Sequence, residues 1–319
     1  MELGIVRERH HMLAEVASLY YESGLNQAEI ASRLGLSRTS ISRLLSEARD
    51  LGVVQISIRW PDDSSGDLGT RLKRAFGLRD AYIVRAGARG HTQLAATLGS
   101  VAAQQLERRL EDNMIFGISW NTGVYQVVQA FRAARKLGVT VVQLTGSAGT
   151  INPLVDGPDL SAWLAHMLGG QYYNIPAPLV VNDPATREAL LHDHTIAEAL
   201  ALAHSADIAL VGIGSVLPPL NRLLQSGYLT AAALDAIKEV GAAGELLTTF
   251  YDINGAILPL EFHKRTIGLP LADLPSVGYV MGVGAGREQV PAILGALRGG
   301  YLDCLVTDDI AAKEILTRR

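Results

Sequence analysis

The sequence predicts an α/β protein in which a small all-α unit precedes a larger unit with a parallel sheet. Two short helical patterns joined by a glycine turn occupy residues 26–51. From residue 67 onward, apolar runs alternate with helical patterns, which is typical of a parallel sheet covered on both faces. The turn-rich, acidic segment PDDSSGD (61–67) separates the two regions. We therefore expect two domains, residues 1–60 and 61–319.

The first helix is expected over residues 9–23, where apolar residues recur at helical spacing. Asn26 is suited to cap a second helix, whose apolar side carries Ala28, Ile30, Ala31 and Leu34. Gly35 supplies the turn, because glycine adopts a left-handed conformation without steric penalty. A third helix follows Ser37, and its inner face carries Ile41, Leu44, Leu45 and Ala48.

The third helix presents polar residues outward, and this division is what a helix-turn-helix needs in order to bind double-stranded operator DNA. An ordinary helical hairpin would not need the Ser-Arg-Thr-Ser opening of this helix. We expect Arg38, Thr39 and Ser42 to reach base edges. Ser37 and Arg43 are expected to bind phosphates, which fixes register without reading sequence.

The segment VVQISIRW (53–60) alternates like a short strand. Two interpretations remain open. The segment either forms the wing of a winged helix-turn-helix or is a linker strand between the domains.

Charge does not supply a basic surface for DNA. The 319 residues carry a net charge of −4, and residues 1–60 contain seven arginines against seven Asp and Glu. Affinity must then come from individually placed contacts and from several copies of the motif, which favours a homo-tetramer or a dimer.

The composition, 48% hydrophobic and 19% charged, predicts a well-packed globular protein. No segment has the length of a signal peptide core or a membrane span, so we expect a cytoplasmic protein with no membrane partner. Cys304, the single cysteine, lies in the apolar run LDCLV and is expected to be a buried structural thiol. His192 and His194 lie two apart in a helical pattern and make a poor metal pair. We expect no metal and no cofactor.

The larger domain is expected to alternate helices and strands in a fixed order. Helices are predicted near 67–77, 92–110, 122–136, 159–168, 184–202, 221–238, 288–299 and 309–317. Strands are predicted at 81–84, 114–119, 139–146, 171–181, 207–214, 277–286 and 302–308.

Four loops after predicted strands combine glycine with hydroxyl residues or further glycines, at 117–123, 145–150, 212–215 and 282–286. In parallel sheets, ligands bind where strand carboxyl ends meet such loops. Glycine lets the backbone approach a ligand, and free amides at helix starts favour an anion. None of the loops has the Gly-Lys-Ser/Thr ending of a Walker loop.

Several segments together resemble the SorC family of transcriptional regulators, the sugar-binding DeoR-like group. The resemblance covers almost the whole chain and rests on LYYESGLNQAEIASRLGLSRTSISRLLSEARDLGVVQI, GISWNTG, ADIALVGIG, LLQSGYL, GELLTTFYDINGAIL and AILGALRGGYLDCLVTDDIAA. It implies a helix-turn-helix joined to a Rossmann-like domain similar to sugar-phosphate isomerases and deaminases. It also implies that a sugar, polyol or sugar phosphate adjusts DNA binding, usually in a tetramer, in control of carbohydrate catabolism.

The resemblance also implies the effector-binding residues. Its loops would place these residues around the ligand: Gly117, Ser119, Thr122, Thr145, Gly146, Ser147, Gly149, Gly212, Gly214 and Ser215. Asp252 and Asn254 would reach the hydroxyl groups, with Glu245 as a neighbour.

Two departures from the family pattern affect the ligand. Asn121 stands where a glycine is expected, so a side chain enters the first loop. Gln289 stands where a lysine is common, and a lysine there would suit a phosphate. Either Arg287 supplies the positive charge, or the effector is an unphosphorylated sugar or polyol; we favour the phosphorylated ligand.

An enzyme with an accessory DNA-binding module is the alternative function. A sugar-phosphate isomerase or deaminase needs a carboxylate base and a second acid-base group, for which Asp252 or Glu245 with His263 or His194 are available. We favour carboxylates that bind ligand hydroxyls without moving protons, and hence no catalytic residues. Trp120 either stacks on a sugar or plugs the edge of the sheet.

Overall fold

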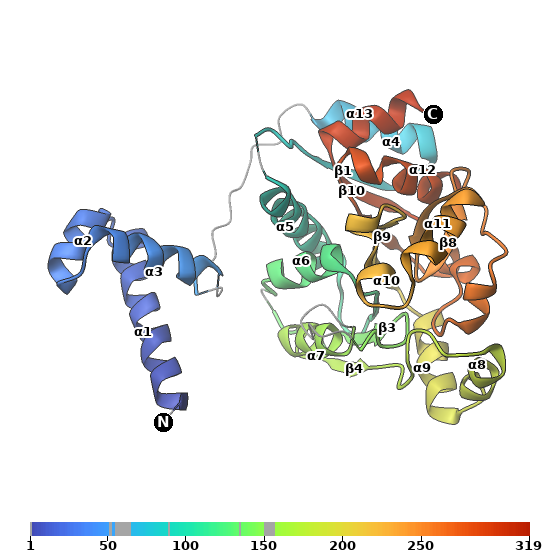
Figure 1. Cartoon of the computed structure of the whole chain (residues 1–319), viewed down its shortest axis with the longest axis horizontal. Helices are drawn as coiled ribbons and strands as arrows, with labels where there is room; N and C mark the ends of the chain where they lie inside the picture. The colour runs from blue at the N-terminus through green and yellow to red at the C-terminus, as the bar shows by residue number, and fades with distance from the viewer. Residues whose placement is uncertain (1, 51–52, 55–64, 89, 134, 150–156) are drawn as a thin grey trace. The chain divides into compact units, whose positions relative to one another are not determined.

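The computed structural model describes residues 2–50, 53–54, 65–88, 90–133, 135–149 and 157–319 (Figure 1). Contacts divide the chain into two compact units, Met1–Pro61 and Asp62–Arg319, and each unit is considered by itself. The segment 53–60, interpreted from sequence as a wing or a linker strand, lies almost wholly outside the described residues.

The first unit contains three helices, α1 (Glu2–Tyr21), α2 (Gln27–Leu34) and α3 (Arg38–Asp50). Their shared core consists of Leu13, Val16, Ala17, Ile30, Ala31, Ile41, Leu44, Leu45 and Ala48. The inner face predicted for the third helix is therefore confirmed. Ala28, expected on the apolar side of α2, lies in the first turn of that helix and is exposed instead.

The second unit is built on a seven-stranded parallel sheet with the order β1-β10-β9-β5-β2-β3-β4. The strands are β1 (Asp80–Val84), β2 (Ile115–Ile118), β3 (Thr140–Gln143), β4 (Gln171–Tyr173), β5 (Ile208–Gly212), β9 (Val280–Val283) and β10 (Cys304–Asp308). β2, β3 and β4 extend the sheet in one direction, whereas β5, β9 and β10 extend it in the other. The order therefore reverses between β2 and β5, where a doubly wound sheet opens a crevice.

Helices cover both faces of this sheet, as the apolar runs predicted. One apolar core joins the sheet to α4 (Ser65–Phe76), α9 (His194–His204), α12 (Val290–Arg298) and α13 (Asp309–Thr317). A second core, on the opposite face, joins it to α5 (His91–Arg109), α6 (Thr122–Ala130) and α7 (Gly157–Leu168). Side chains along β5 alternate between the two cores, with Leu210 in one and Val211 in the other.

The structure adds a three-stranded antiparallel sheet that the sequence did not predict. It consists of β6 (Gly214–Ser215), β7 (Ala242–Leu246) and β8 (Thr249–Asp252). With α10 (Arg222–Gln225) and α11 (Ala231–Glu239) it encloses a further core around Phe250. Short 3-10 helices complete the unit: η2 (Pro218–Leu220), η3 (Glu261–Arg265), η4 (Leu271–Ser276) and η5 (Arg287–Gln289).

Several predicted elements are shorter than expected, among them the helix predicted at 122–136, which ends at Ala130. The strand predicted at 171–181 ends at Tyr173. The helix predicted at 184–202 is two helices, α8 (Pro184–Leu191) and α9. The break occurs because the Asp193 side chain accepts hydrogen bonds from Thr195 N and Ile196 N and so starts a new helix.

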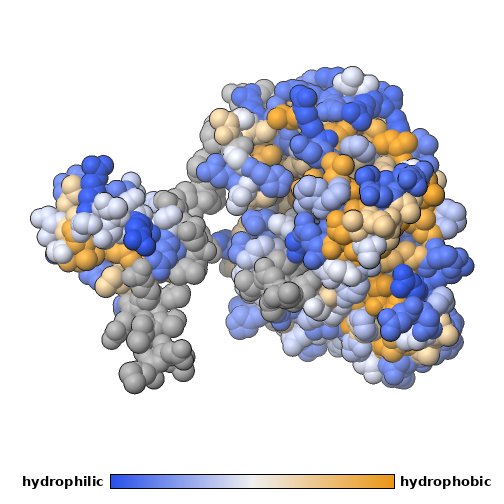
Figure 2. All heavy atoms as spheres, viewed as in Figure 1, coloured by the Kyte–Doolittle hydropathy of each residue, from blue (hydrophilic) through white to orange (hydrophobic). Residues whose placement is uncertain are grey.

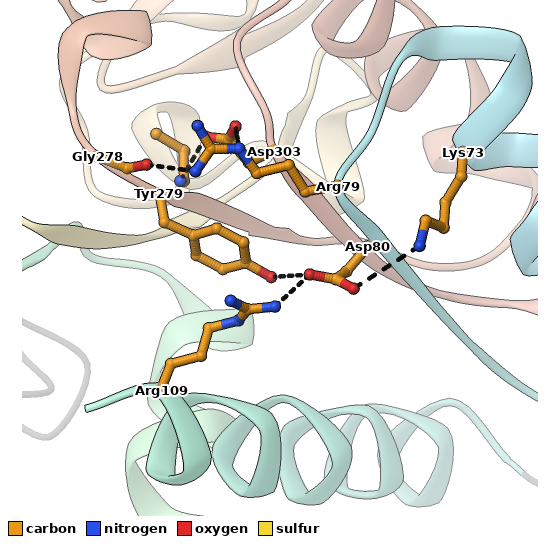
Figure 3. A network of polar contacts seen from close by, with 8 residues as sticks. Lys73, Arg79, Asp80, Arg109, Gly278, Tyr279 and Asp303 are labelled. Atoms are coloured by element: carbon orange, nitrogen blue, oxygen red, sulfur yellow. Dashed lines mark hydrogen bonds and ion pairs between the residues drawn. The ribbon is translucent and has the colours of Figure 1, made fainter. Parts of the chain in front are cut away.

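A polar network ties the amino-terminal ends of β1, β9 and β10 together (Figure 3). The Asp80 carboxylate is bound by Arg109, receives a hydrogen bond of 3.0 Å from the Tyr279 hydroxyl, and lies 3.9 Å from Lys73 Nζ. The Arg109 guanidinium also lies 4.0 Å from the centre of the Tyr279 ring. The network is at the edge of the sheet opposite the strand carboxyl ends, so it holds strands together rather than facing a ligand.

Candidate functional site

Three local features, at Asn26, Gly35 and Ser37, set the boundaries of the helices in the helix-turn-helix. Asn26 Oδ1 accepts from Ala28 N and Glu29 N at 3.0 Å each, and Glu29 Oε2 accepts from Asn26 N at 2.7 Å. This reciprocal pair is a capping box. Gly35, with φ of 64°, ends α2. Ser37 Oγ accepts from Ser40 N at 3.1 Å and so starts α3.

The outer face of α3 is exposed within the described part of its own unit. Arg38, Thr39, Ser42 and Arg43 are exposed along it, while the inner face is buried against α1 and α2. The helix can therefore enter a major groove without unpacking the unit. The Ser37 hydroxyl accepts from Ser40 N and is 2.9 Å from Ser40 Oγ, so it can donate to a phosphate only when Ser40 is the donor between the two hydroxyls or its bond to Ser40 Oγ is exchanged.

The second candidate site is a pocket of about 210 Å³ at the carboxyl ends of β2, β5 and β9. It lies at the point where the strand order reverses, as expected for an open parallel sheet. Apolar residues from α5, the strand ends and the 213–220 loop form much of its wall. The polar side chains among its lining residues are His91, Asn121, Thr122, Arg222, Gln225 and Gln289.

Arg222 is the cation of this pocket. Its Nη1 donates to Gln225 Oε1 at 2.7 Å, while its Nε is buried without a hydrogen-bond partner in the described part of the chain. No carboxylate is among the residues that line the pocket. Burial lowers the pKa of Arg222, but an arginine still remains charged. An unpaired, partly buried guanidinium is a site for an anionic group.

Gln289 and Asn121, the two departures from the family pattern, both line the pocket. Gln289 joins two loops, since its Oε1 accepts from Ala285 N at 2.7 Å and its Nε2 lies 3.3 Å from Ile213 O. Asn121 caps α6 by accepting from Val124 N at 2.9 Å. Both ends of the Gln289 amide are therefore bonded and shape the pocket. Asn121 bonds only through its oxygen, so its Nδ2 can donate a hydrogen bond to a ligand.

Further predicted residues lie at the pocket or close to the strand ends that form it. Gly214 lines it directly. Ser119 is buried and accepts a hydrogen bond from Gly212 N at 3.2 Å, which joins the ends of β2 and β5. Gly117 packs against Leu144 within the sheet.

Glu245 stands behind Gly214 as its cross-strand partner. A Cβ on Gly214 would meet Glu245 Oε1 at 2.0 Å, so only glycine leaves room there. Glu245 Oε2 accepts from Thr248 N at 3.0 Å. Burial raises the pKa of Glu245 to about 7, although the Thr248 hydrogen bond opposes the shift. Ser215 is buried and accepts from Leu217 N at 3.1 Å, which shapes the loop that carries Arg222.

The loop 145–149 and the turn 252–254 are not among the residues that line this pocket. Thr145, Gly146 and Ser147 bond to the backbone of neighbouring segments at 177–179 and 267–268. Gly149 has φ of 58° and precedes residues outside the described part.

Asp252 closes its own turn, because its Oδ1 accepts from Asn254 N at 2.8 Å and Ala256 N at 2.9 Å. Arg287 is 76% exposed, and its Nε lies 3.9 Å from Glu314 Oε2. Asp252, Asn254 and Arg287 are therefore outside the group of residues that the structure brings together at the pocket.

The aromatic and histidine residues considered in the sequence analysis pack in a core, bond to the backbone or lie on the surface, and none of them lines the pocket. Trp120 is 8% exposed and packs in the core around Phe250, which fits a plug at the sheet edge. His263 Nε2 accepts from Phe250 N at 2.9 Å. His192 and His194 are exposed, and each faces a glutamate one turn away. Cys304 is buried, as expected.

Arg222, Gln225 and His91 are the pocket residues that sequence reasoning missed. Arg222 immediately precedes the motif LLQSGYL and Gln225 lies within it; the motif contributed to the resemblance without any residue in it being assigned a role. His91 starts α5, a position that carries no motif. Only the fold brings residues 91, 222 and 289 together.

Comparisons with known proteins identify both units of the chain. Residues 63–317 match the Sugar-bind family of sugar-binding domains, and residues 14–50 match region 4 of sigma-70. The chain belongs to the SorC family. The curated relatives are transcriptional regulators, so the SorC-family chain is a regulator with a helix-turn-helix and an effector domain, rather than an enzyme.

Relatives match over nearly their whole length. The sorbitol operon regulator of Klebsiella pneumoniae is 29% identical over 308 residues, which cover 96% of this chain and 97% of the relative. The deoxyribonucleoside regulator of Bacillus subtilis is 29% identical over 310 residues, 97% of this chain and 98% of the relative. The crystal structure of full-length SorC from K. pneumoniae superposes with a TM-score of 0.76 over 96% of this chain and 98% of that chain, at 29% identity.

Among the helices in the described ranges, none combines the length and the apolar composition that crossing a membrane requires.

Proposed function

We propose that the pocket between α5, α10 and the ends of β2, β5 and β9 binds a phosphorylated carbohydrate, and that this ligand adjusts binding of α3 to operator DNA. The observation that carries the proposal is Arg222, a partly buried guanidinium with an unpartnered Nε in a pocket whose described lining has no carboxylate. A buried unpaired charge is unfavourable unless a ligand completes it. Arg222 thus supplies the positive charge that the family's lysine would provide at the position of Gln289.

Helix starts at the pocket support an anionic ligand. His91 begins α5, Thr122 begins α6, and Gln289 precedes α12, and all three residues line the pocket. The amino-terminal ends of helices carry partial positive charge and free N–H groups, so they favour phosphate groups.

Thermal melting of the full-length protein tests the ligand class. We expect phosphorylated sugars to raise the melting temperature and free sugars or polyols at the same concentration to leave it unchanged. A ligand at a hundred times its Kd adds about 2.7 kcal/mol of stability. Arg222→Gln should abolish the shift, whereas Arg287→Gln, which changes a residue outside the pocket, should keep it. Stabilisation by free polyols alone would contradict the proposal.

On the DNA side, Arg38, Thr39 and Ser42 are proposed to contact base edges, and Ser37 and Arg43 to contact phosphates. All five residues are exposed at the start of α3 or along its outer face, which supports this assignment. Fluorescence anisotropy with operator DNA, with and without the ligand found by melting, measures the coupling between the two sites. Equal DNA affinity in both conditions would show that the ligand does not adjust DNA binding.

The protein is proposed to act as a homo-tetramer or a dimer, since the neutral helix-turn-helix unit needs more than one copy for strong binding. Figure 2 shows apolar side chains gathered around α10 and α11, and the exposed large apolar residues of this unit include Leu217, Val240 and Ile257. Such patches are common at subunit contacts. Sedimentation velocity should show no monomer at micromolar concentration, and a monomer there would contradict the assembly.

A further inference from the structure

Asn121 covers the bottom of the pocket at the reversal of strand order. It follows β2, and its carboxamide lies over Gly212, the last residue of β5. A Cβ added to Gly212 would lie 1.7 Å from Asn121 Nδ2 and 2.0 Å from its Cγ. The carboxamide therefore fills the space that a ligand atom would otherwise take between the two strand ends.

The orientation of this carboxamide is fixed by the helix that it caps. Asn121 Oδ1 accepts from Val124 N at 2.9 Å. A flipped amide would direct its own hydrogens at that N–H, so the oxygen must face Val124 and the nitrogen must face away. Nδ2 makes no hydrogen bond to any residue in the described part of the chain. It is a donor held in place without a partner.

The other amide side chains of the pocket are already engaged. Gln225 accepts from Arg222 Nη1 and donates to Pro219 O at 2.8 Å. Gln289 accepts from Ala285 N and donates to Ile213 O. Among the amide and guanidinium groups, Asn121 Nδ2 and the free nitrogens of Arg222 remain, and both are donors, while the Thr122 hydroxyl and the His91 imidazole can also accept. A phosphate or carbonyl oxygen only accepts hydrogen bonds and matches them, whereas a polyol also brings donors of its own.

We propose that Asn121 determines which phosphorylated carbohydrates the pocket accepts. Its Nδ2 donates to a carbonyl or anionic oxygen of the ligand, and its carboxamide excludes ligands with a substituent over Gly212. This inference rests on the proposed function, because it requires an anionic carbohydrate in the pocket.

Two substitutions separate the hydrogen bond from the steric effect. Asn121→Asp keeps the size and the capping oxygen but replaces the donor with a negatively charged acceptor. Asn121→Ser keeps a capping oxygen and opens the space over Gly212. Asp and Ser cap helices about as well as Asn, so α6 should fold in both variants.

Isothermal titration of the full-length protein with inorganic phosphate, ribose 5-phosphate, fructose 6-phosphate, sorbitol 6-phosphate and fructose 1,6-bisphosphate measures the effect. The wild-type protein's best probe should bind Asn121→Asp at least about tenfold more weakly, since a hydrogen bond to a charged acceptor contributes that much or more. Asn121→Ser should shift the ranking toward a larger probe. Wild-type affinities and ranking in both variants would overturn the inference.

Arg222→Gln distinguishes failure of this inference from failure of the proposed function. If Arg222→Gln loses binding while both Asn121 variants retain it, the pocket binds anions and Asn121 does not select among them. If the wild-type protein binds none of the probes, the proposed function is wrong, and the role of Asn121 is overturned with it.

A measurement without ligand checks the underlying contact. Gly212→Ala should lower the melting temperature of the wild-type protein, because the added methyl group collides with the carboxamide. The same substitution in the Asn121→Ser background should lower it less. Equal losses in the two backgrounds would show that Asn121 does not occupy the space over Gly212.

Discussion

At the scale of single residues, Glu245 combines burial with a position next to the pocket at the strand ends. Its carboxyl group lies against Gly214 and holds Thr248 N. Leu247 and Thr248 both have positive φ, at 49° and 63°, which is strained for residues with a Cβ. Glu245 thus stabilises a strained hairpin turn, and burial raises its pKa to about 7.

The raised pKa makes stability depend on pH. Between the unfolded value near 4.5 and the folded value of about 7, the folded protein holds a proton that the unfolded chain releases, so stability falls as pH rises through this range. Above about pH 7 the Glu245 carboxylate is ionised in both states, and the full cost of burying its charge lowers the stability of the folded protein. Glu245→Gln keeps the acceptor for Thr248 N and removes the penalty.

The variant should therefore gain stability over the wild type as pH rises from 5 to 8, by about 1–3 kcal/mol. Urea unfolding at constant ionic strength measures both proteins across this range. Parallel pH profiles would show that Glu245 ionises as it does in the unfolded chain.

Arg222 shows why part of the site escaped sequence reasoning at the residue scale. Glycine and hydroxyl residues after apolar strands predicted a ligand at the strand ends, and Asn121, Thr122, Gly214 and Gln289 do line the pocket. Arg222 follows a loop of the antiparallel sheet, whose strand β6 has two residues and no periodicity to read. Its role depends on contacts between segments far apart in sequence.

At the scale of elements, capping residues correctly predicted where α2 begins and ends and where α3 begins. Asn26, Gly35 and Ser37 act through bonds to residues within a few positions, so their effect is visible in the sequence. The predicted helix over 184–202 failed because Asp193 caps a second helix inside an otherwise continuous apolar pattern. Local capping overrode periodicity there.

The Asp80 network acts on strands β1, β9 and β10 and should matter for stability alone. Asp80→Asn removes the charge that balances Arg109 and Lys73 and should cost about 1–2 kcal/mol, because these groups are only partly solvent-exposed. That loss corresponds to a melting temperature lower by roughly 2–8 °C. Scanning calorimetry measures it.

The stabilisation that a phosphorylated sugar gives should be unchanged in Asp80→Asn, since the network lies at the sheet edge opposite the pocket. Asp67→Asn, which breaks an exposed ion pair with Arg71, is the matched control and should melt like the wild type. A variant at Asp80 that folds normally but loses ligand binding would show that the two edges of the sheet are coupled.

At the scale of the whole molecule, a neutral DNA-binding unit must rely on few phosphate contacts per copy. Each phosphate neutralised adds about 0.9 to the slope of log affinity against log salt concentration. Arg43→Ala should lower this slope by about 1 for each copy bound. Fluorescence anisotropy on duplex DNA selected by the protein from a random pool, at several salt concentrations, gives the slope.

Thr39→Ala should instead change which sequences are selected and leave the slope unaltered, because a base contact releases no counterions. Arg71→Ala, on the other unit of the chain, should change neither property. An unchanged slope for Arg43→Ala would move the phosphate contact to another residue of α3.

Cys304 has a practical consequence for site-specific labelling of the protein. It is the only cysteine of the chain, lies fully buried in β10, and its pKa is raised by burial to about 12. Maleimides and methanethiosulfonates react with accessible thiolates, which this residue does not present near neutral pH. In a Ser46→Cys variant, position 46 on α3 would be the sole labelled position. Spin labels there would report the distance between the α3 helices of two copies in the proposed assembly, with no other cysteine replaced.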